Sequence, residues 1–312
     1  MWLLPNRYRS SSEILTTSHS DSDAAPLAEL TPQLEDGYGI KVLHDPQQPV
    51  VDIVFVHGLT GGQVSTWAAE GAAQPWPQSF LAKDIPTARI SAFGYDADVV
   101  KVFGQAGQNK LRQHASNLVA CVADLQFESK SAPPIIFVAH SLGGLVCENM
   151  LTIASSGEQH WREVLESTIA IAFLGTPHRG SDSASWAKIA GNLVNVARRT
   201  NTSILGVLEP DSEVLENVTN DFHNLRRSRE DDGKKKVQIT CYGEEKAMEM
   251  GGKSVLVVPT QSASLDGCTF VTLSGCDHSS MTKFGTKNSE YGKVRTQIKR
   301  WIQAMTPAPG SS

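Results

Sequence analysis

The sequence has no long apolar run, no paired cysteine motif and no surplus of basic residues. Its apolar segments, such as residues 51–56 and 168–174, are much shorter than the roughly 20 residues that a membrane-spanning helix needs. The five cysteines are odd in number and never form a CxxC or CxxH pair, which argues against a disulfide framework or a zinc site. Lys plus Arg number 28 against 33 Asp plus Glu, so no positive excess is available for a nucleic-acid backbone. We therefore expect no integral membrane segment, no nucleic-acid partner, no metal and no cofactor.

Unpaired cysteines also bear on location. Free thiols are typical of reducing compartments, so the cytoplasm is the predicted location. Mitochondria are the minor alternative, because Arg7 and Arg9 precede a Ser/Thr-rich stretch that resembles a presequence.

The chain of 312 residues is long enough for one large domain with short flexible ends. Residues 1–35, rich in Ser, Thr, Asp and Pro, are predicted to be a flexible leader. The domain is expected over 36–306, and residues 307–312 form a tail. Two amphipathic patterns between about 180 and 236 predict a helical lid insertion over an active site, with ordinary sheet-covering helices as the alternative.

Short apolar runs alternate with longer segments of helical periodicity over most of this domain. Several runs are apolar at consecutive positions, which indicates strands covered by helices on both faces. The predicted strands are 38–43, 50–56, 88–93, 135–139, 168–174, 237–242 and 269–273. The predicted helices are 76–83, 107–128, 142–155, 183–199, 211–229 and 289–305. This alternation predicts an α/β fold with a mostly parallel, doubly wound sheet; an eight-stranded α/β barrel would need more clean strands.

The strongest chemical signal is the run IIFVAHSLGGLV at residues 135–146. An apolar strand leads through Ala-x-Ser-x-Gly-Gly into a helix, which is the context of a nucleophile elbow. Ala139 and Gly143 are small, so strand and helix can approach closely around a strained turn that exposes the Ser141 hydroxyl. Ala139 replaces the first glycine of the usual G-x-S-x-G motif. We therefore predict that Ser141 is a nucleophile.

A serine nucleophile needs hydrogen-bond donors for the oxyanion that forms when it attacks a carbonyl. The glycine-rich turn HGLTGG at residues 57–62 follows an early strand and can supply a backbone N–H at the same sheet edge. We assign the oxyanion hole to the amides of Leu59 and Leu142. A tight turn with no role in the reaction is the alternative.

A base must also lie within reach of the serine. In this kind of fold the order along the chain is nucleophile, acid and then histidine, which points to His278 after the last strand. Packing roles are expected for His57, His140 and His178, which also lie near strand ends. A rival set of metal ligands would be His57, His178, Asp182 and His278, but none of these shows the His-x-x-x-His spacing of helix-borne ligands.

The acid of the triad is the least determined member. Glu244 follows the strand at 237–242 and is the first choice for orienting the imidazole. Asp182 is the second, and Glu245 and Asp266 follow. Asp277 adjoins His278 in sequence and is interpreted as structural, because neighbours on a loop rarely face each other.

With these segments in place, the chain resembles the α/β-hydrolase superfamily. More narrowly, it is similar to the lipase-like group of serine-active-site-containing proteins and GPI inositol deacylases, above all to fungal stand-alone relatives. The matching segments are residues 54–62, 66–67, 88–98, 137–144, 173–181, 258–259 and 277–278. The resemblance implies a Ser141 nucleophile and a His278 base, and it supports Glu244.

The same resemblance implies a serine hydrolase or acyl transferase. The expected substrate is a hydrophobic acyl ester or thioester, including a carrier-bound polyketide or fatty acyl chain that a thiohydrolase would release by hydrolysis or lactonisation. A lipid esterase of the phospholipase kind is the alternative enzyme. An interaction module of the same fold without catalysis is the alternative of another class.

Overall fold

The structure is a computed structural model that describes residues 34–59, 61–97, 107–129, 132–179, 183–200, 212–250 and 252–305. The predicted tail, and the predicted leader up to residue 33, lie outside these ranges. None of the helices within them is both long and apolar enough to cross a lipid bilayer.

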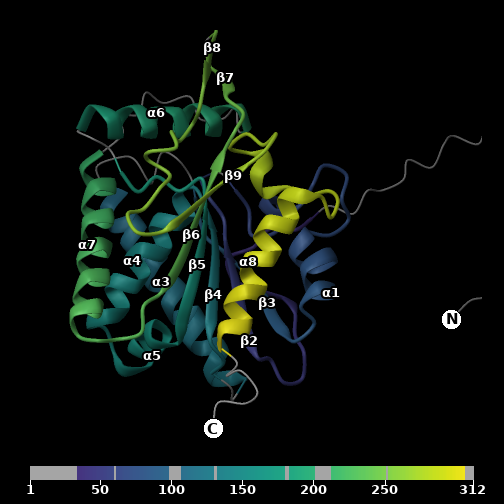
Figure 1. The fold of residues 1–312 in the computed structure, drawn as a ribbon, viewed down its shortest axis with the longest axis vertical. Coiled ribbons are helices and arrows are strands. Elements are labelled where there is room, and N and C mark those ends of the chain that lie inside the picture. The colour runs from purple at the N-terminus through teal and green to yellow at the C-terminus, as the bar shows by residue number, and fades with distance from the viewer. Residues whose placement is uncertain are drawn as a thin grey trace, which may run out of the picture. The chain divides into compact units, whose positions relative to one another are not determined.

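One seven-stranded sheet forms the centre of the described chain (Figure 1). Its strands are β1 (Gly39–His44), β2 (Val51–Val56), β3 (Ala88–Gly94), β4 (Ile135–His140), β5 (Thr168–Leu174), β6 (Gln238–Glu244) and β9 (Thr269–Leu273). Their order is β1-β3-β2-β4-β5-β6-β9, with β1 antiparallel to β3 and all other neighbours parallel. Each predicted strand is present, and its ends are shifted by no more than two residues. The prediction of a mostly parallel, doubly wound sheet is therefore confirmed.

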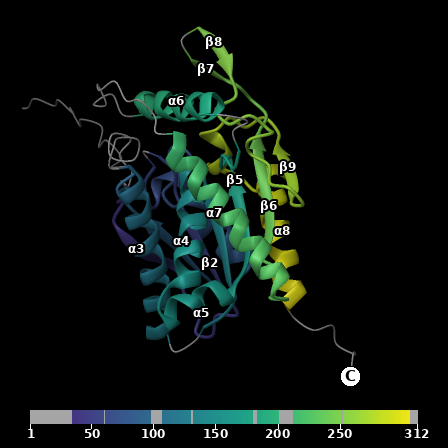
Figure 2. The ribbon, with the colours of Figure 1, turned by 90° about the vertical axis from the view of Figure 1, so that its left-hand side faces the viewer.

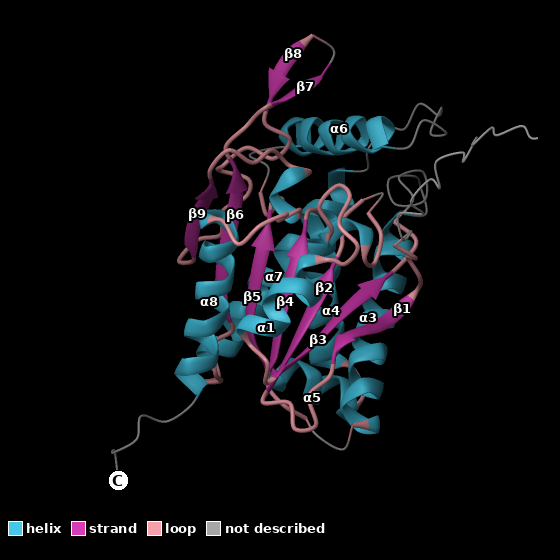
Figure 3. Ribbon diagram, turned by 90° about the vertical axis from the view of Figure 1, so that its right-hand side faces the viewer, coloured by secondary structure: helices cyan, strands magenta, loops and turns pink. Residues whose placement is uncertain are grey.

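Helices cover the sheet on both faces. They are α1 (Ala82–Asp84), α3 (Gly107–Glu128), α4 (Leu142–Ser156), α5 (Gln159–Ser167), α6 (Ser183–Thr200), α7 (Ser212–Asp231) and α8 (Ser289–Met305). Figure 2 looks onto the face that carries α3, α4, α5 and α7, and Figure 3 onto the face with α1 and α8. The short α5 and a two-stranded hairpin, β7 (Met248–Met250) with β8 (Lys253–Val255), were not predicted. The strands of the hairpin are too short to show a hydrophobic period, whereas α5 is a nine-residue amphipathic helix that buries Val164 and Leu165.

The central strands are apolar at consecutive positions because each face packs under helices. On β2, Val54 and Val56 join the cluster beneath α3, α4 and α7, whereas Ile53 and Phe55 join the cluster beneath α8. Alternate side chains of a strand point to opposite faces, so both sets are shielded from water. The two clusters cover both faces of the sheet. Loops can therefore carry functional side chains at its carboxyl edge.

The predicted lid insertion contains helices with two different positions. Leu215, Val218 and Phe222 of α7 are buried in the cluster that includes α4, so α7 is a sheet-covering helix. In contrast, α6 lies across the carboxyl ends of the central strands (Figures 1 and 2). Trp186, Ile189 and Leu193 of α6 are buried in the same cluster, so both helices bury their apolar faces in the core. A helical lid over an active site therefore stays a prediction.

Gly143 lets α4 pack closely against the end of β2. A Cβ atom there would lie 2.6 Å from the carbonyl oxygen of Val56 and would overlap the carbonyl of His57. Neither backbone group can move without disturbing the sheet or the turn that follows it. Gly143 was predicted to let the strand and the helix approach closely, and in the structure it lies directly against the backbone of Val56 and His57.

Replacing Gly143 with alanine should destabilise the protein, although alanine is normally the better helix former. We expect Gly143→Ala to lower the free energy of unfolding by about 1–3 kcal/mol through overpacking. The matched control is Gly292→Ala in α8, where nothing lies within 4 Å of the added Cβ. This control should raise stability by about 0.5–1 kcal/mol. Urea denaturation measures both, and a stabilised Gly143→Ala would contradict the packing described above.

Candidate active site

Ser141 occupies a strained turn between β4 and α4. Its backbone has φ 51° and ψ −124°, and it is the one non-glycine residue with positive φ among those that the structure describes. Its N–H donates a 2.8 Å hydrogen bond to the carbonyl of Leu174 on the neighbouring strand β5. Strain of this kind persists only where the surrounding structure enforces it. This geometry holds the hydroxyl at the carboxyl edge of the sheet, as a nucleophile elbow requires.

The structure brings Ser141, His278 and Glu244 together in one hydrogen-bonded chain. His278 Nε2 is 2.9 Å from Ser141 Oγ, and His278 Nδ1 is 2.7 Å from Glu244 Oε2. The side chains of His278 and Glu244 are almost fully buried, at 2% and 1% exposure. Because the carboxylate can only accept, Nδ1 carries the proton and the lone pair of Nε2 faces the serine. The tautomer is therefore the one that can remove the hydroxyl proton.

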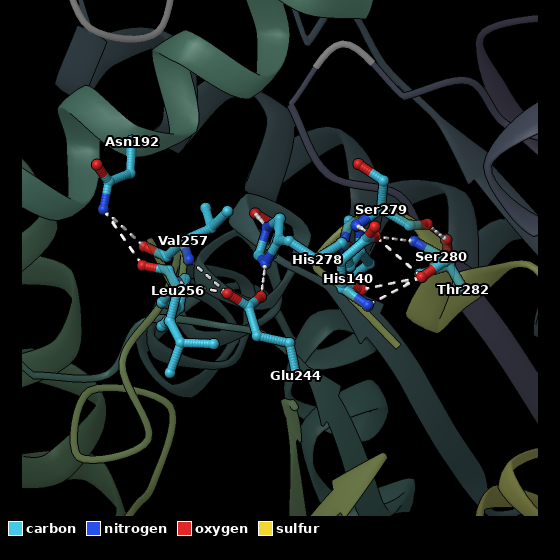
Figure 4. Close-up of polar contacts among 12 residues, drawn as sticks. His140, Asn192, Glu244, Leu256, Val257, His278, Ser279, Ser280 and Thr282 are labelled. Carbon is cyan, nitrogen blue, oxygen red and sulfur yellow. Dashed lines mark hydrogen bonds and ion pairs between the residues drawn. The ribbon is translucent and has the colours of Figure 1, made fainter. Parts of the chain in front are cut away.

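The second oxygen of Glu244 is held by backbone amides. The N–H groups of Val257 and Val258 both donate to Oε1, the latter at 3.2 Å. The carbonyls of Leu256 and Val257 in turn accept hydrogen bonds from Asn192 on α6, at 3.4 and 3.3 Å (Figure 4). A buried carboxylate needs such donors, because an unpaired charge is costly to bury. Glu244 is thus fixed on both sides, and α6 is tied to the same loop.

The other acids considered from sequence serve different contacts. Glu245 Oε2 accepts from the Gly275 amide at 2.7 Å, and Asp266 forms an ion pair with Arg179. Asp277 accepts from the amides of Ser279 and Ser280, so it caps the short helical turn after His278. Asp182 lies outside the described residues.

The two amides assigned to the oxyanion hole lie at the same edge as Ser141. Leu142 is the first residue of α4, where a helix N–H has no intrahelical partner. Leu59, Ser141 and His278 line one cavity. In the described part of the chain, neither the Leu59 nor the Leu142 amide donates a backbone hydrogen bond outside regular secondary structure. The positive end of α4 adds to the attraction for a negative oxygen.

His57 orients the turn that carries Leu59. Its Nδ1 lies 2.9 Å from the Gly58 carbonyl oxygen, and the Tyr95 amide donates to Nε2 at 3.2 Å. Nδ1 is therefore the protonated nitrogen and donates to Gly58. Within one trans peptide the C=O and N–H point in opposite directions, so holding the Gly58 carbonyl toward His57 aims the Leu59 N–H away from it. This packing role has a direct effect on the predicted oxyanion hole.

His140 supports the backbone of His278. Its Nε2 is 2.9 Å from the His278 carbonyl oxygen, and the two rings lie 4.9 Å apart. Burial lowers the pKa of His140 well below its ordinary value, and nearby His278 adds to the effect. A neutral His140 donates this hydrogen bond without placing a second positive charge beside His278.

His178 is paired with a carboxylate that the sequence reasoning missed. Its Nδ1 is 2.6 Å from Glu148 Oε1, and both side chains are fully buried. Glu148 is a lone acid among the apolar residues of α4, which is a signal that the sequence does contain. Among the described residues, no group of three or more His, Cys, Asp or Glu side chains is arranged to hold a metal ion.

A cavity of about 190 Å³ opens beside Ser141 and His278. Leu59 and two residues of α6, Leu193 and Val196, form its aliphatic part. The remaining lining residues are Gly61, Ser65, Thr66, His140, Ser279, Thr282 and Lys283. The cavity therefore offers an apolar surface next to the serine together with polar groups for the rest of a substrate.

The free energy of unfolding should decrease as the pH is lowered, because His57 is buried in its neutral form. Burial lowers the pKa of His57 to about 4, so the folded chain binds its proton more weakly than the unfolded chain, whose histidine has an ordinary value of about 6.5. Stability is thus complete above about pH 6.5 and is lost as pH falls toward 4. Between pH 7.5 and 5 this histidine should cost about 2 kcal/mol.

The variant His57→Asn cannot titrate and should lose about 2 kcal/mol less over the same interval. Urea denaturation at several pH values measures the difference. Parallel pH slopes in the two proteins would show that His57 is not held neutral.

Comparison with known proteins identifies the family of the chain. The family model described as PGAP1-like alpha/beta domain matches residues 47–220, which is more than half of the chain. Protein SERAC1 of Homo sapiens is 28% identical over 277 residues, covering 82% of this chain and 40% of that protein. Protein SERAC1 of Danio rerio is 28% identical over 278 residues, with the same shares. The chain thus spans about two fifths of the length of these curated relatives.

Solved structures with similar folds include lipases, an esterase and a thioesterase domain. The mature Bacillus licheniformis lipase BlEst2 aligns with 81% of this chain and 94% of its own, at 18% identity and a TM-score of 0.49. A Paleococcus ferrophilus monoacylglycerol lipase aligns with 88% and 100%, at 12% identity and a TM-score of 0.44. From the family match and the order of its sheet, the chain belongs to the PGAP1-like alpha/beta domain family and has the α/β-hydrolase fold.

Proposed function

We propose that this protein is a serine hydrolase or acyl transferase that acts on acyl esters or thioesters. The observation that carries the proposal is the chain of hydrogen bonds from Ser141 through His278 to Glu244. In this arrangement Ser141 is the nucleophile, His278 the general base and Glu244 the group that orients the imidazole.

The first half of the reaction forms an acyl-enzyme. Ser141 Oγ bonds to the substrate carbonyl carbon while His278 Nε2 takes the hydroxyl proton. The carbonyl electron pair moves to oxygen, and the amides of Leu59 and Leu142 stabilise the resulting oxyanion, one such donor being worth about 3 kcal/mol. When the carbonyl re-forms, the bond to the alcohol or thiol breaks and His278 returns the proton to this leaving group.

The second half releases the acyl group. Water, or a hydroxyl on the acyl chain itself, gives its proton to His278 and attacks the acyl carbon. The bond to Ser141 then breaks, and the serine recovers its proton from His278. Attack by water yields a free acid, whereas attack by an internal hydroxyl yields a lactone.

The cavity supports a hydrophobic acyl group. Leu193 and Val196 of α6 face the same space as Ser141, so an alkyl chain bound there would be shielded from water. Two acyl donors fit this chemistry: a carrier-bound thioester of the polyketide or fatty acyl kind, and a lipid ester. They differ in the leaving group, and we carry both into the experiments.

Ser141 should be the site of labelling by a fluorophosphonate probe. Its oxygen would bond to phosphorus and fluoride would leave, with the proton passing to His278. We expect labelling of the wild type, none of Ser141→Ala, and normal labelling of Ser155→Ala, an exposed serine at the end of α4. Turnover of a p-nitrophenyl ester should not change with a chelator, because the proposed groups include no metal. A wild-type protein that is not labelled by the probe, and whose ester turnover is lost with a chelator, would refute the proposal.

The leaving group can be identified with one acyl chain presented in two forms. Incubation with an N-acetylcysteamine thioester and with a lipid ester of the same acyl chain should give an acyl adduct on Ser141, detected by intact mass. A thioesterase should acylate faster with the thioester, and a lipid esterase with the lipid. Equal adducts on Ser141→Ala would exclude both readings.

A module of the same fold that binds without catalysis would pass neither experiment. The strained turn at Ser141 argues against it, because positive φ at a serine costs about 1–3 kcal/mol and packing alone does not need it.

We also propose a cytoplasmic location. All five cysteines are free thiols, which fits a reducing compartment.

A further inference from the structure

The buried pair of Glu148 and His178 is separate from the hydrogen-bonded chain of the proposed triad. Glu148 Oε1 and His178 Nδ1 are 2.6 Å apart, and neither side chain is exposed to solvent. Removing ionisable groups from water costs several kcal/mol per charge, and pairing with good geometry is needed to offset it. A pair of this kind in the core therefore calls for a specific explanation.

The Glu148 end of the pair is attached to the helix of the nucleophile. Glu148 lies seven residues after Ser141 on α4, about 10 Å along the helix axis at 1.5 Å per residue. Helix α4 is a rigid rod whose first residue supplies an oxyanion amide. A residue that contacts Glu148 therefore also fixes helix α4, which positions Ser141.

The His178 end is attached to the loop of the acid. The His178 amide donates to the Ser262 carbonyl at 2.7 Å. Ser262 and Ala263 both donate to the Pro259 carbonyl, at 2.8 and 2.9 Å, which closes a tight turn. This turn directly follows Val258, one of the two residues whose amides hold Glu244.

These contacts close a ring around the site. One side runs from Ser141 through His278 to Glu244, and the other runs from α4 through Glu148 and His178 to the turn at 259–263. We propose, on the basis of the proposed function, that Glu148 and His178 are positioning residues: they lock the loop that holds Glu244 to the helix that holds Ser141. The pair acts on catalysis only through Glu244.

The surroundings of the pair agree with a hydrogen-bonding role. Cys241 of β6 places its sulfur 3.8 Å from His178 Nε2, and the ring of Phe173 packs edge-on against the His178 ring. From α7, Arg226 attracts the charge of Glu148. Burial lowers the pKa of His223 on the same helix, and nearby Arg226 and His178 add to this effect. Cys147 is the neighbouring group on α4 itself.

Burial raises the pKa of Glu148, and His178 opposes this effect. Glu148 Oε2 has no hydrogen-bond partner in the described chain. The contact that matters is therefore the single acceptor at Oε1, and an uncharged amide oxygen can replace it.

The test is a double-mutant cycle on kcat. Glu148→Ala should lower kcat by up to about 100-fold, because a displacement of about 1 Å at the triad has an effect of that size. KM should change by no more than about twofold, since the substrate cavity is not touched. In a Glu244→Ala background the same change should have almost no further effect, because the positioned group is already gone.

Two more variants separate positioning from stability. Glu148→Gln keeps the acceptor and should retain most of kcat. The control Asp52→Asn breaks another buried pair, in which Asp52 receives two hydrogen bonds from Arg89 at 2.7 and 2.8 Å, at the opposite end of the strands. It should lose stability but keep kcat. If Glu148→Ala does not fold, Glu148→Asp replaces it in the double-mutant cycle. Its side chain is one methylene shorter, so the carboxylate lies farther from His178.

The outcomes divide clearly. An equal loss of kcat in both backgrounds, or an unchanged kcat in Glu148→Ala, overturns the positioning role while normal wild-type turnover leaves the proposed function standing. A loss in Asp52→Asn as large as that in Glu148→Ala also overturns it. A wild-type protein with neither turnover nor labelling of Ser141 refutes the proposed function, and the positioning role with it.

Discussion

The strained turn at Ser141 is the constraint on which the rest of the site depends. The positive φ of Ser141 is enforced because β4 ends and α4 begins on either side of this one residue. The Ser141 amide also donates a hydrogen bond to the Leu174 carbonyl of the neighbouring strand β5. This geometry forces α4 against the end of β2, where Gly143 leaves no room for a side chain. It also makes Leu142, the residue after the serine, the first residue of α4. The proposed nucleophile, the proposed oxyanion donor and the close packing therefore depend on one backbone conformation.

Several buried histidines lie at the carboxyl edge of the sheet, and each makes a different hydrogen bond. His57 holds the Gly58 carbonyl, His140 holds the backbone of His278, and His178 holds Glu148. Burial favours the neutral form of His57 and His140 by lowering the pKa of each. A neutral imidazole can donate at one nitrogen and accept at the other, so these two histidines can order the loops around His278 without adding charge there.

Helix α6 shows how the fold couples substrate space to the triad. Its residues Leu193 and Val196 line the cavity, and Asn192 on the same helix binds the loop that holds Glu244. A movement of α6 would therefore change both the cavity and the support of the acid.

The strands and the position of Ser141 follow from sequence alone, because unbroken apolar runs and a strand-turn-helix motif are local patterns. His278 follows from its order along the chain after the last strand. Only the tertiary structure decided that Glu244, and not Glu245 or Asp266, faces His278, because the choice depends on side-chain direction at a strand end. The same is true of α7 covering the sheet and of Glu148 meeting His178. Contacts between residues distant in sequence depend on how the helices pack, and no local pattern records that packing.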